Sequence, residues 1–294
     1  MIVDAHAHAF PTEASGHEWQ RLLGVDEPRR TGEIGELAEI VTEAGIDRTV
    51  VLLNVRAGER FAELQAAGAP DAREQVREQL FALNRWGCRL GREDARFLPF
   101  IGVNVRFLSP AELVEEIDRG VAEGARGVKI IPPSMRVYAD DPLLRPVVQR
   151  CCELGLPLLS QSGSGGGDPP APGADHYGRP GRWDAVLREF ADLKLILAHL
   201  GHGYEEDIVR LCASHEHVYT DTSMRLSRLG QPGQPTEAEL VALIRRIGAE
   251  RVLLGTNYPF VSPAAYVARL GELPFTDAER ALVGGENFVR AVGV

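Results

Sequence analysis

Eight short apolar runs alternate with segments of helical periodicity along the chain, and this alternation limits its possible folds most strongly. Most runs are rich in Val, Ile and Leu without alternating polar residues, which is typical of strands buried on both faces. Strands that alternate with helices are expected to be parallel and joined by crossover helices. Eight such rounds in 294 residues favour a closed barrel over an open sheet, because a barrel needs about 250 residues.

We therefore predict one α/β domain over residues 1–294, a (β/α)8 TIM barrel. The predicted strands are Ile2–His6, Thr49–Val55, Phe97–Val105, Gly127–Ile131, Pro157–Gln161, Lys194–His199, Val218–Asp221 and Arg251–Asn257. Capping residues support the helices between them. Thr31 is predicted to cap one helix. Ser109 as N-cap, Pro110 in the first turn and Gly124 as the stop predict another.

Composition and charge argue against several classes of protein. The net charge is −10 and no run of Lys or Arg occurs, which argues against nucleic-acid and anionic-membrane partners. No apolar run approaches the roughly 18 residues of a membrane-spanning helix. The four cysteines show no CxxC spacing and the N-terminus has no basic leader, so we expect reduced cysteines and a cytoplasmic protein. A homo-oligomer remains open as an alternative to a monomer.

Polar residues lie in or end several of the predicted strands, and in a barrel the carboxyl ends of the strands meet on one face. The first strand leads into a His-x-His pair, His6 and His8, and strict alternation would place Asp4 on the same face as both. Two imidazoles at this spacing can bind one metal ion. The other strands contribute Lys129, Gln161, His199, Asp221 and Asn257. Such a convergence favours a functional site over isolated buried polar groups.

Loops on the same face add further candidates. The Gly- and Pro-rich segment 162–181 is predicted to be a lid, because it follows the fifth strand and matches no phosphate-binding motif. Arginines follow several strands, and a guanidinium can bind a carboxylate through two hydrogen bonds. Among them, Arg106 and Arg225 are our candidates for binding an anionic substrate. The full set is Arg56, Arg106, Arg136, Arg225 and Arg228.

Several motifs occur in a fixed order: "DAHAHAF", "GLPLLSQSG", "LKLILAHLGHG", "VYTDTS", "GTNYPF" and the closing "ERALVGGENFVRAVGV". Together they resemble the amidohydrolase-related family of metal-dependent hydrolases over essentially the whole chain. Its members include aminocarboxymuconate semialdehyde decarboxylase, aromatic acid decarboxylases and dicarboxylate lactonases. The resemblance implies an enzyme that acts on a small carboxylated molecule by hydrolysis or decarboxylation, without an organic cofactor.

The resemblance also implies a metal site, and this chain departs from it at two positions. Family members bind the metal through the His-x-His pair, here His6 and His8, a His ending the fifth strand and an Asp ending the eighth. Here Gln161 and Asn257 stand at the last two positions. Zinc prefers imidazole and carboxylate ligands, and amides are poor replacements. We therefore expect a degenerate site in which a divalent metal such as zinc is weakly bound or absent.

Without the carboxylate, other groups must move protons. By resemblance, His199 is the first candidate, followed by Asp221 and Lys129. Two alternatives stay open: a metal-free acid/base enzyme of a specialised biosynthetic pathway, and a non-catalytic ligand-binding barrel. Metal content separates the metal-dependent enzyme from the metal-free one, and binding without turnover would indicate the third.

Overall fold

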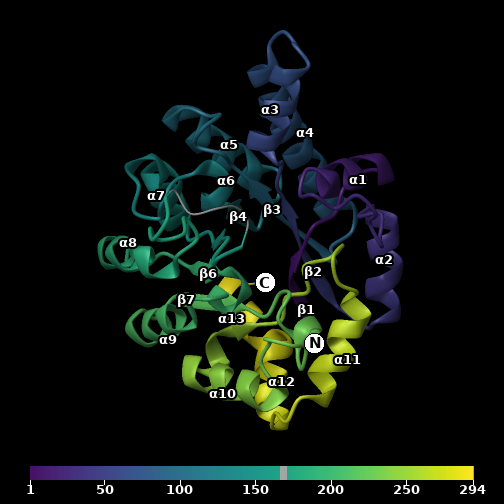
Figure 1. The fold of residues 1–294 in the computed structure, drawn as a ribbon, viewed down its shortest axis with the longest axis vertical. Coiled ribbons are helices and arrows are strands. Elements are labelled where there is room, and N and C mark those ends of the chain that lie inside the picture. Colours follow the sequence, from purple (N-terminus) through teal and green to yellow (C-terminus); the bar gives the residue numbers. More distant parts are fainter. Residues whose placement is uncertain (166–170, 294) are drawn as a thin grey trace.

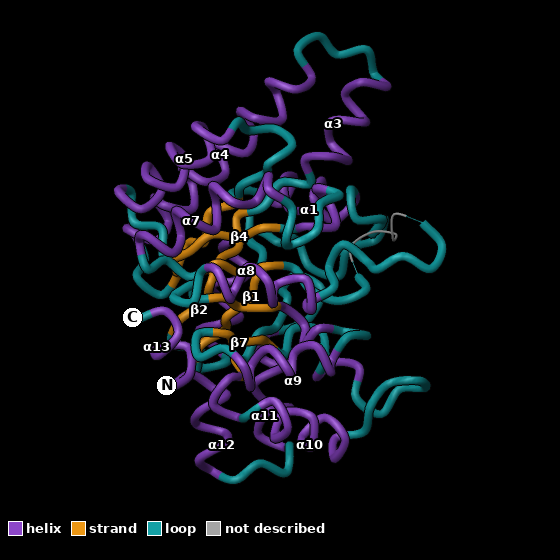
Figure 2. The backbone as a smooth tube through the Cα atoms, turned by 90° about the vertical axis from the view of Figure 1, so that its left-hand side faces the viewer, coloured by secondary structure: helices purple, strands orange, loops and turns teal. Residues whose placement is uncertain are grey.

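The computed structural model describes residues 1–165 and 171–293, and its centre is an eight-stranded barrel. The strands follow one another around the barrel in sequence order, and each neighbouring pair is parallel. Helices surround them (Figures 1 and 2). The predicted (β/α)8 barrel is confirmed. The strands are β1 (Val3–Ala7), β2 (Arg48–Leu53), β3 (Phe97–Gly102), β4 (Gly127–Ile130), β5 (Leu158–Ser160), β6 (Leu195–Leu197), β7 (Val218–Asp221) and β8 (Val252–Leu253).

Thirteen helices are described, together with short 3-10 or π turns. The helices are α1 (Glu13–Arg21), α2 (Ile34–Glu43), α3 (Ala57–Ala66), α4 (Ala72–Glu93), α5 (Pro110–Ala122), α6 (Pro132–Met135), α7 (Arg145–Leu154), α8 (Trp183–Glu189), α9 (Glu205–Ser214), α10 (Glu237–Ile247), α11 (Pro263–Glu272), α12 (Asp277–Ala281) and α13 (Asn287–Val292). The turns are η1 (Pro142–Leu144), η2 (Pro180–Arg182), η3 (Ala198–Gly201), η4 (Leu226–Arg228), η5 (Ala249–Arg251) and η6 (Leu282–Glu286). None of the described helices is long and apolar enough to cross a membrane.

Of the two predicted helix N-caps, one is confirmed and the other is wrong. Ser109 caps α5 as predicted, in a capping box with Glu112 and with Pro110 in the first turn. Thr31 does not cap α2; the cap is Glu33, whose carboxylate accepts from backbone N–H groups of the first turn. A carboxylate there also faces the positive end of the helix dipole, so it serves the same purpose as a hydroxyl.

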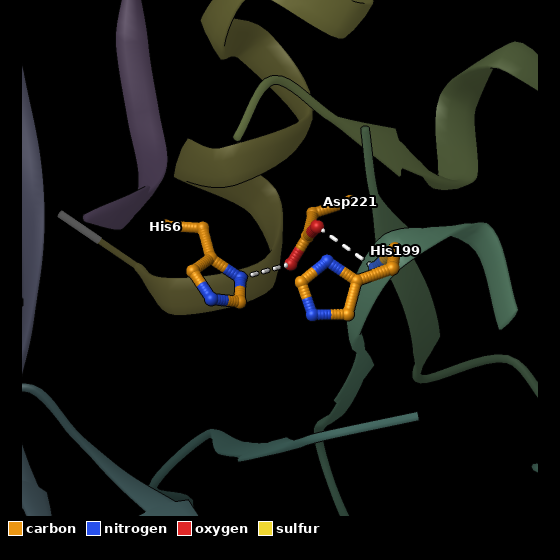
Figure 3. Close-up of side chains that lie close together, drawn as sticks. All are labelled: His6, His199 and Asp221. Atoms are coloured by element: carbon orange, nitrogen blue, oxygen red, sulfur yellow. Dashed lines mark hydrogen bonds and ion pairs between the residues drawn. The ribbon is translucent and has the colours of Figure 1, made fainter. Parts of the chain in front are cut away.

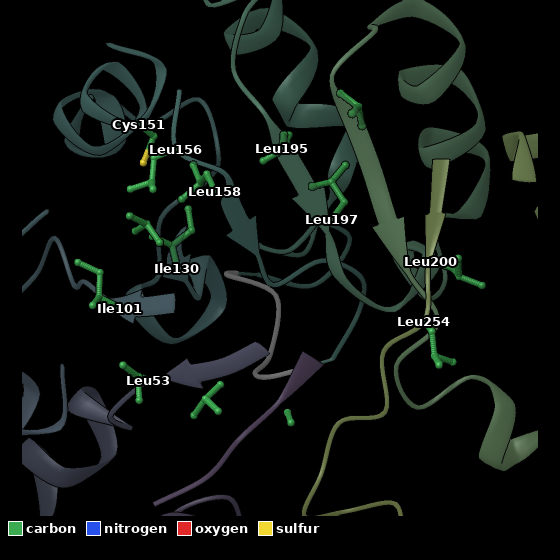
Figure 4. Close-up of a cluster of buried hydrophobic side chains, with 14 of the residues drawn as sticks. Leu53, Ile101, Ile130, Cys151, Leu156, Leu158, Leu195, Leu197, Leu200 and Leu254 are labelled. Carbon is green, nitrogen blue, oxygen red and sulfur yellow. The ribbon is translucent and has the colours of Figure 1, made fainter. Parts of the chain in front are cut away.

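Two apolar clusters hold the barrel together. The barrel-interior cluster contains residues from every strand except β4, and Phe288 and Ala291 of α13. The helix-side cluster lies between the strands and the surrounding helices, and Figure 4 shows part of it. Lys129 of β4 pairs in register with Leu159 of β5, a member of the interior cluster. Alternation along the strand therefore places a lysine where the other strands contribute apolar side chains.

A register shift in β1 corrects the predicted alternation. The pairing of β1 with β2 shifts between Asp4 and Ala7. Ala5 accordingly belongs to the barrel-interior cluster, whereas Ala7 belongs to the helix-side cluster. An extra residue in one strand inverts the alternation that follows it. His6 therefore does not share the face of Asp4, whose carboxylate instead accepts from the backbone N–H of His6 at 3.0 Å.

The barrel closes where β1 meets the residues that follow β8. The backbone N–H of Ala5 donates to the carbonyl of Leu254 at 2.7 Å, and that of Asn257 donates to the carbonyl of His6 at 2.7 Å. The predicted lid at 162–181 includes residues 166–170, which lie outside the described residues. In its described part, the Ser162 hydroxyl donates to the carbonyl of Ala198 at 2.6 Å, which ties the start of this segment to the end of β6.

Candidate active site

The structure brings the predicted polar residues together at the carboxyl ends of the strands. The ring centroids of His6 and His8 are 5.3 Å apart, and those of His6 and His199 are 5.0 Å apart. One cavity of about 330 Å³ is lined by His8, Lys129, Gln161, His199 and Asn257. A small molecule could therefore contact most of these groups at once.

Asp221, at the end of β7, accepts hydrogen bonds from several residues around this cavity. Its Oδ2 atom accepts from Nδ1 of His6 at 2.9 Å, and its Oδ1 atom accepts from the backbone N–H of His199 at 3.0 Å (Figure 3). The Ser223 hydroxyl and backbone N–H donate to Oδ1 as well. Burial opposes ionisation of this carboxyl, but the nearby His6 ring and these donors outweigh it and hold its pKa below the usual range.

His6, His199 and Asp221 also form a group of side chains of metal-ligand type, with ligand atoms within 4.8 Å of one another. The oxygens of Asp221 are already occupied by hydrogen bonds. We therefore interpret Asp221 as the residue that orients the two imidazoles and not as a metal ligand. A carboxylate that accepts from the far nitrogen of a ligating His is a common arrangement behind metal sites.

His199 lies in an unusual backbone conformation that aims its ring. It follows β6 in turn η3, with φ of 64°, and Leu200 after it has φ of 52°. Left-handed backbone is uncommon for such residues and is concentrated at functional sites. The ring then reaches Ser223 through Nδ1, 2.6 Å from Oγ, and Gln161 through Nε2, 3.0 Å from Oε1.

The hydrogen bonds fix which nitrogen of His199 carries the proton. The Ser223 hydroxyl donates to Asp221, so it can only accept from Nδ1–H of His199. Burial, reinforced by the nearby His6, lowers the pKa of His199 to about 3, so the ring is neutral. Its Nε2 atom then carries a lone pair and accepts a hydrogen bond from a suitable donor. The side-chain amide of Gln161 supplies that donor when its NH2 group faces the ring, an orientation that differs by a simple amide flip.

The two histidines of the His-x-His pair each have one nitrogen fixed. Nδ1 of His8 lies 3.3 Å from the backbone carbonyl of Leu52, and Nδ1 of His6 donates to Asp221. Nε2 of His6 is buried and has no hydrogen-bond partner within the described residues. Burial is the main cause that lowers the pKa of both rings, most strongly for His8, so both present neutral nitrogens.

Lys129 is the buried cation of the site. Its side chain is 1% exposed, and Nζ has no hydrogen-bond partner among the described residues. Burial lowers its pKa to about 7, and the charge of Asp221 opposes that shift. A lysine with such a pKa exchanges a proton readily near neutral pH.

Gln161 and Asn257, which we predicted to replace metal ligands, both line the site cavity. Asn257 follows β8 with φ of 70°, a left-handed conformation that Asn and Asp tolerate better than most residues. Its side chain forms no hydrogen bond within the described part of the chain. Gln161 follows β5 and is held by His199. Because Asp tolerates the left-handed backbone as Asn does, the backbone at Asn257 would also suit an Asp.

The predicted arginines differ from one another in their positions relative to the site cavity. Arg106 is exposed, donates to the carbonyls of Met135 and Arg136, and does not line the site cavity. Arg225 is buried beside the cavity mouth, where it is paired with Glu205 at 2.9 Å and bonded to His202. Arg228 instead lines the site cavity, exposed and without a side-chain partner among the described residues.

Two further residues were missed by the sequence reasoning. Asn54 follows β2 and is 5% exposed, and neither of its side-chain polar atoms has a partner within the described residues. Trp19 of α1 stacks on His8, with ring centroids 4.6 Å apart. Both line the site cavity. The sequence offered a weak signal for Asn54, a polar residue after an apolar run, and none for Trp19.

Comparison with known proteins identifies the family. The sequence model of the Amidohydrolase family matches residues 3–294. The chain belongs to this family. A search of curated protein sequences gave no significant match.

Solved structures similar to this amidohydrolase include several decarboxylases. 2,6-Dihydroxybenzoate decarboxylase from Rhizobium shares 18% identity over 99% of this chain and 98% of its own, with a TM-score of 0.70. 5-Carboxyvanillate decarboxylase from Sphingomonas paucimobilis shares 18% sequence identity over 100% of this chain and 99% of its own, with a TM-score of 0.68. Dihydroxybenzoic acid decarboxylase from Polaromonas sp. JS666, solved with bound manganese and 2-nitroresorcinol, shares 17% sequence identity over 99% of this chain and 96% of its own. Its TM-score is 0.70. At this identity the likeness concerns the fold.

The residues of this amidohydrolase fit a divalent cation at one pair of positions. Nε2 of His6 is a buried acceptor without a hydrogen-bond partner among the described residues, and a carboxylate orients its ring, as is typical of a metal-ligating His. Nε2 of His8 is likewise the nitrogen available to a metal, because the other ring nitrogen, Nδ1, faces a backbone carbonyl. Gln161 and Asn257 could add only amide groups, which zinc disfavours.

Proposed function

We propose that this amidohydrolase is a carboxy-lyase that removes a carboxyl group from a small organic acid, with weakened dependence on metal. The observation that carries this proposal is the buried Lys129, which lines the site cavity and whose Nζ has no hydrogen-bond partner among the described residues. A cation in a desolvated pocket attracts a carboxylate strongly, and the electrostatic interaction is much greater there than in water.

Hydrolysis is less well supported because it needs a base to activate water. The family's carboxylate position holds Asn257, which cannot accept a proton at useful pH. His199 is a poor base, since its pKa is about 3 and its lone pair is occupied by Gln161. Asp221 is committed to hydrogen bonds from His6, His199 and Ser223 and is therefore proposed as a positioning residue.

Decarboxylation needs fewer groups, and the site contains them. A proton from Nζ of Lys129 adds to the ring carbon that bears the carboxylate, and a pair of ring π electrons forms the new carbon–hydrogen bond. The carbon–carboxyl bond then breaks, carbon dioxide leaves, and the electron pair of that bond restores the aromatic ring, while Lys129 regains its proton from solvent. A pKa of about 7 suits this exchange. Arg228 at the cavity wall is proposed to attract the anionic substrate.

A divalent cation such as zinc or manganese, when bound by His6 and His8, would supply additional positive charge to hold the substrate's oxygens. Gln161 and Asn257 are proposed as remnants of the full ligand set, which would make that binding weak. The decarboxylases among the similar structures support the choice of an aromatic carboxylate as substrate class.

The test is release of carbon dioxide from a panel of hydroxylated benzoates, with 2,6-dihydroxybenzoate as the first member. We expect release to survive treatment with a chelator, to be lost in Lys129→Met, and to survive in Lys194→Met. Lys194 is a suitable control because it is the other lysine in the sequence. Hydrolysis of the matching esters or amides without carbon dioxide release would overturn the proposal.

A further inference from the structure

A second cavity lies beside the site cavity, between α1 and α4. Its volume is about 320 Å³, and its walls are mainly apolar. Figure 1 shows α1 beside α4 at the edge of the barrel. Its apolar lining residues include Phe10, Trp19, Leu22, Ala82, Leu83 and Trp86. We call this space the α1–α4 cavity.

The α1–α4 cavity and the site cavity share part of their walls. Trp19, Asn54 and Arg56 line both. Trp19 contacts the ring of His8 on the site side, so the partition between the cavities is one aromatic ring thick at that point. A molecule bound near Lys129 could therefore extend past this ring into the apolar space.

The boundary between the cavities carries polar atoms without hydrogen-bond partners among the described residues. Asn54 is 5% exposed, and neither its amide oxygen nor its amide nitrogen has such a partner. Nε of Arg56 is also buried and lacks a partner within the described part of the chain, while the other end of that guanidinium pairs with Glu59. Buried polar groups are nearly always satisfied, because leaving them unpaired is costly. Asn54 and Arg56 line both cavities, so they are the polar residues at this boundary that a ligand would bond to.

The size of the α1–α4 cavity defines the apolar part of that ligand. An apolar cavity of about 150 Å³ in another protein binds one benzene molecule. The α1–α4 cavity, at about 320 Å³, therefore has room for roughly two rings or a branched chain of similar volume.

We propose that the substrate is an amphiphilic carboxylate with an apolar arm. Its carboxylated head lies at Lys129 and the imidazoles, its arm of about two rings fills the α1–α4 cavity, and Asn54 bonds a hydroxyl or carbonyl oxygen at the junction. This proposal rests on the proposed function and narrows its substrate class.

Two probes separate the arm from the head: salicylate, which has only the head, and 4-phenylsalicylate, which adds one ring. Affinities are measured by isothermal titration calorimetry. We expect the longer probe to bind at least about tenfold more tightly, since burying a ring of this size favours binding by that order.

Variants then locate the arm. Ala82 is exposed at the rim of the α1–α4 cavity, so Ala82→Trp can fill the cavity without opening a hole in the core. We expect it to reduce the affinity for 4-phenylsalicylate to that for salicylate and to leave salicylate binding unchanged. Ala242→Trp is the control, because Ala242 is exposed on α10 and lines none of the cavities described above. Asn54→Leu should weaken binding of both probes about tenfold, because both carry the hydroxyl that Asn54 is proposed to bond, while raising the melting temperature.

The outcomes distinguish the two proposals. If salicylate binds and the phenyl group adds nothing, or if Ala82→Trp has no effect on the longer probe, the arm proposal is overturned and the proposed function stands. If neither probe binds to the unmodified protein, the proposed function fails with it.

Discussion

Nε2 of His199 lies 3.0 Å from the side-chain amide of Gln161. Because the other nitrogen of His199 donates to Ser223, Nε2 is an acceptor, and it accepts from Gln161 when the NH2 group of that amide faces the ring. We propose that Gln161 replaces a metal-ligating imidazole, and its amide holds the neighbouring imidazole of His199 instead. This hydrogen bond would occupy the groups of both residues that could otherwise bind a metal or a water molecule.

The first prediction concerns that bond. Gln161→Met should lower the free energy of unfolding by about 1 kcal/mol, the usual contribution of one such hydrogen bond. Urea unfolding at pH 7 measures the change. Gln149→Met is the matched control, since Gln149 is exposed on α7 and bonds only to Glu153. An equal effect at both positions would show that the Gln161–His199 bond contributes nothing.

A second prediction follows from the buried amine of Lys129. Its pKa is about 7 when folded and near 10.5 when unfolded. The unfolded chain therefore binds more protons between these values, and the stability of the wild type rises with pH across that window. Below about pH 7 the folded protein bears the full cost of burying the charged Lys129 ammonium group, so Lys129→Met should stabilise the protein most there.

The stabilisation of Lys129→Met should be about 2 kcal/mol greater at pH 6 than at pH 9, because each unit of pKa shift corresponds to about 1.4 kcal/mol. Urea unfolding at the two pH values measures it. Lys194→Met, on a residue only partly buried, should show no such difference. If Lys129→Met gave the same gain at both pH values, the amine would not be titrating as the burial requires.

The hydrogen bonds that Asp221 accepts give the third prediction. Asp221→Asn should lower the free energy of unfolding by about 1.5–3 kcal/mol at pH 7, as expected for lost hydrogen bonds to a charged group. The pKa of this carboxyl is below its usual range, so its contribution is present above about pH 4 and is lost as pH falls further. The gap between wild type and variant should therefore shrink below pH 4.

Acid and urea titrations followed by circular dichroism measure that gap. Asp192→Asn is the control, because Asp192 is exposed. A gap that stayed constant down to pH 2 would mean that the charge of Asp221 is not what stabilises the site.

The barrel could be predicted from sequence because strands buried on both faces have a local signature. The runs around Val51, Phe100 and Leu253 are continuous and apolar, and they lie in strands as predicted. The convergence of His6 and His199 followed from the barrel itself, since strand ends meet on one face.

Other features depend on contacts that no local pattern encodes. The register shift in β1 separates Asp4 from His6, although strict alternation pairs them. The left-handed conformation of His199 ended β6 earlier than the apolar run suggested. Asn54 matters because α1 and α4, distant in sequence, leave a cavity beside it, and only the folded chain shows this.

The central claim is that Gln161 and Asn257 leave an amidohydrolase site that binds metal weakly. Loss of a ligand-orienting partner typically costs about 10–100-fold in metal affinity, and loss of a direct ligand should cost more. Restoring the ligands with Gln161→His and Asn257→Asp would supply an imidazole and a carboxylate, which zinc prefers.

The most direct measurement is zinc content per chain by elemental analysis, after identical purification of both proteins with zinc present. The account predicts well below one zinc per chain in the unmodified protein and close to one in the double variant. Near-stoichiometric zinc in the unmodified protein would contradict it and would make this chain an ordinary metal-dependent amidohydrolase despite Gln161 and Asn257.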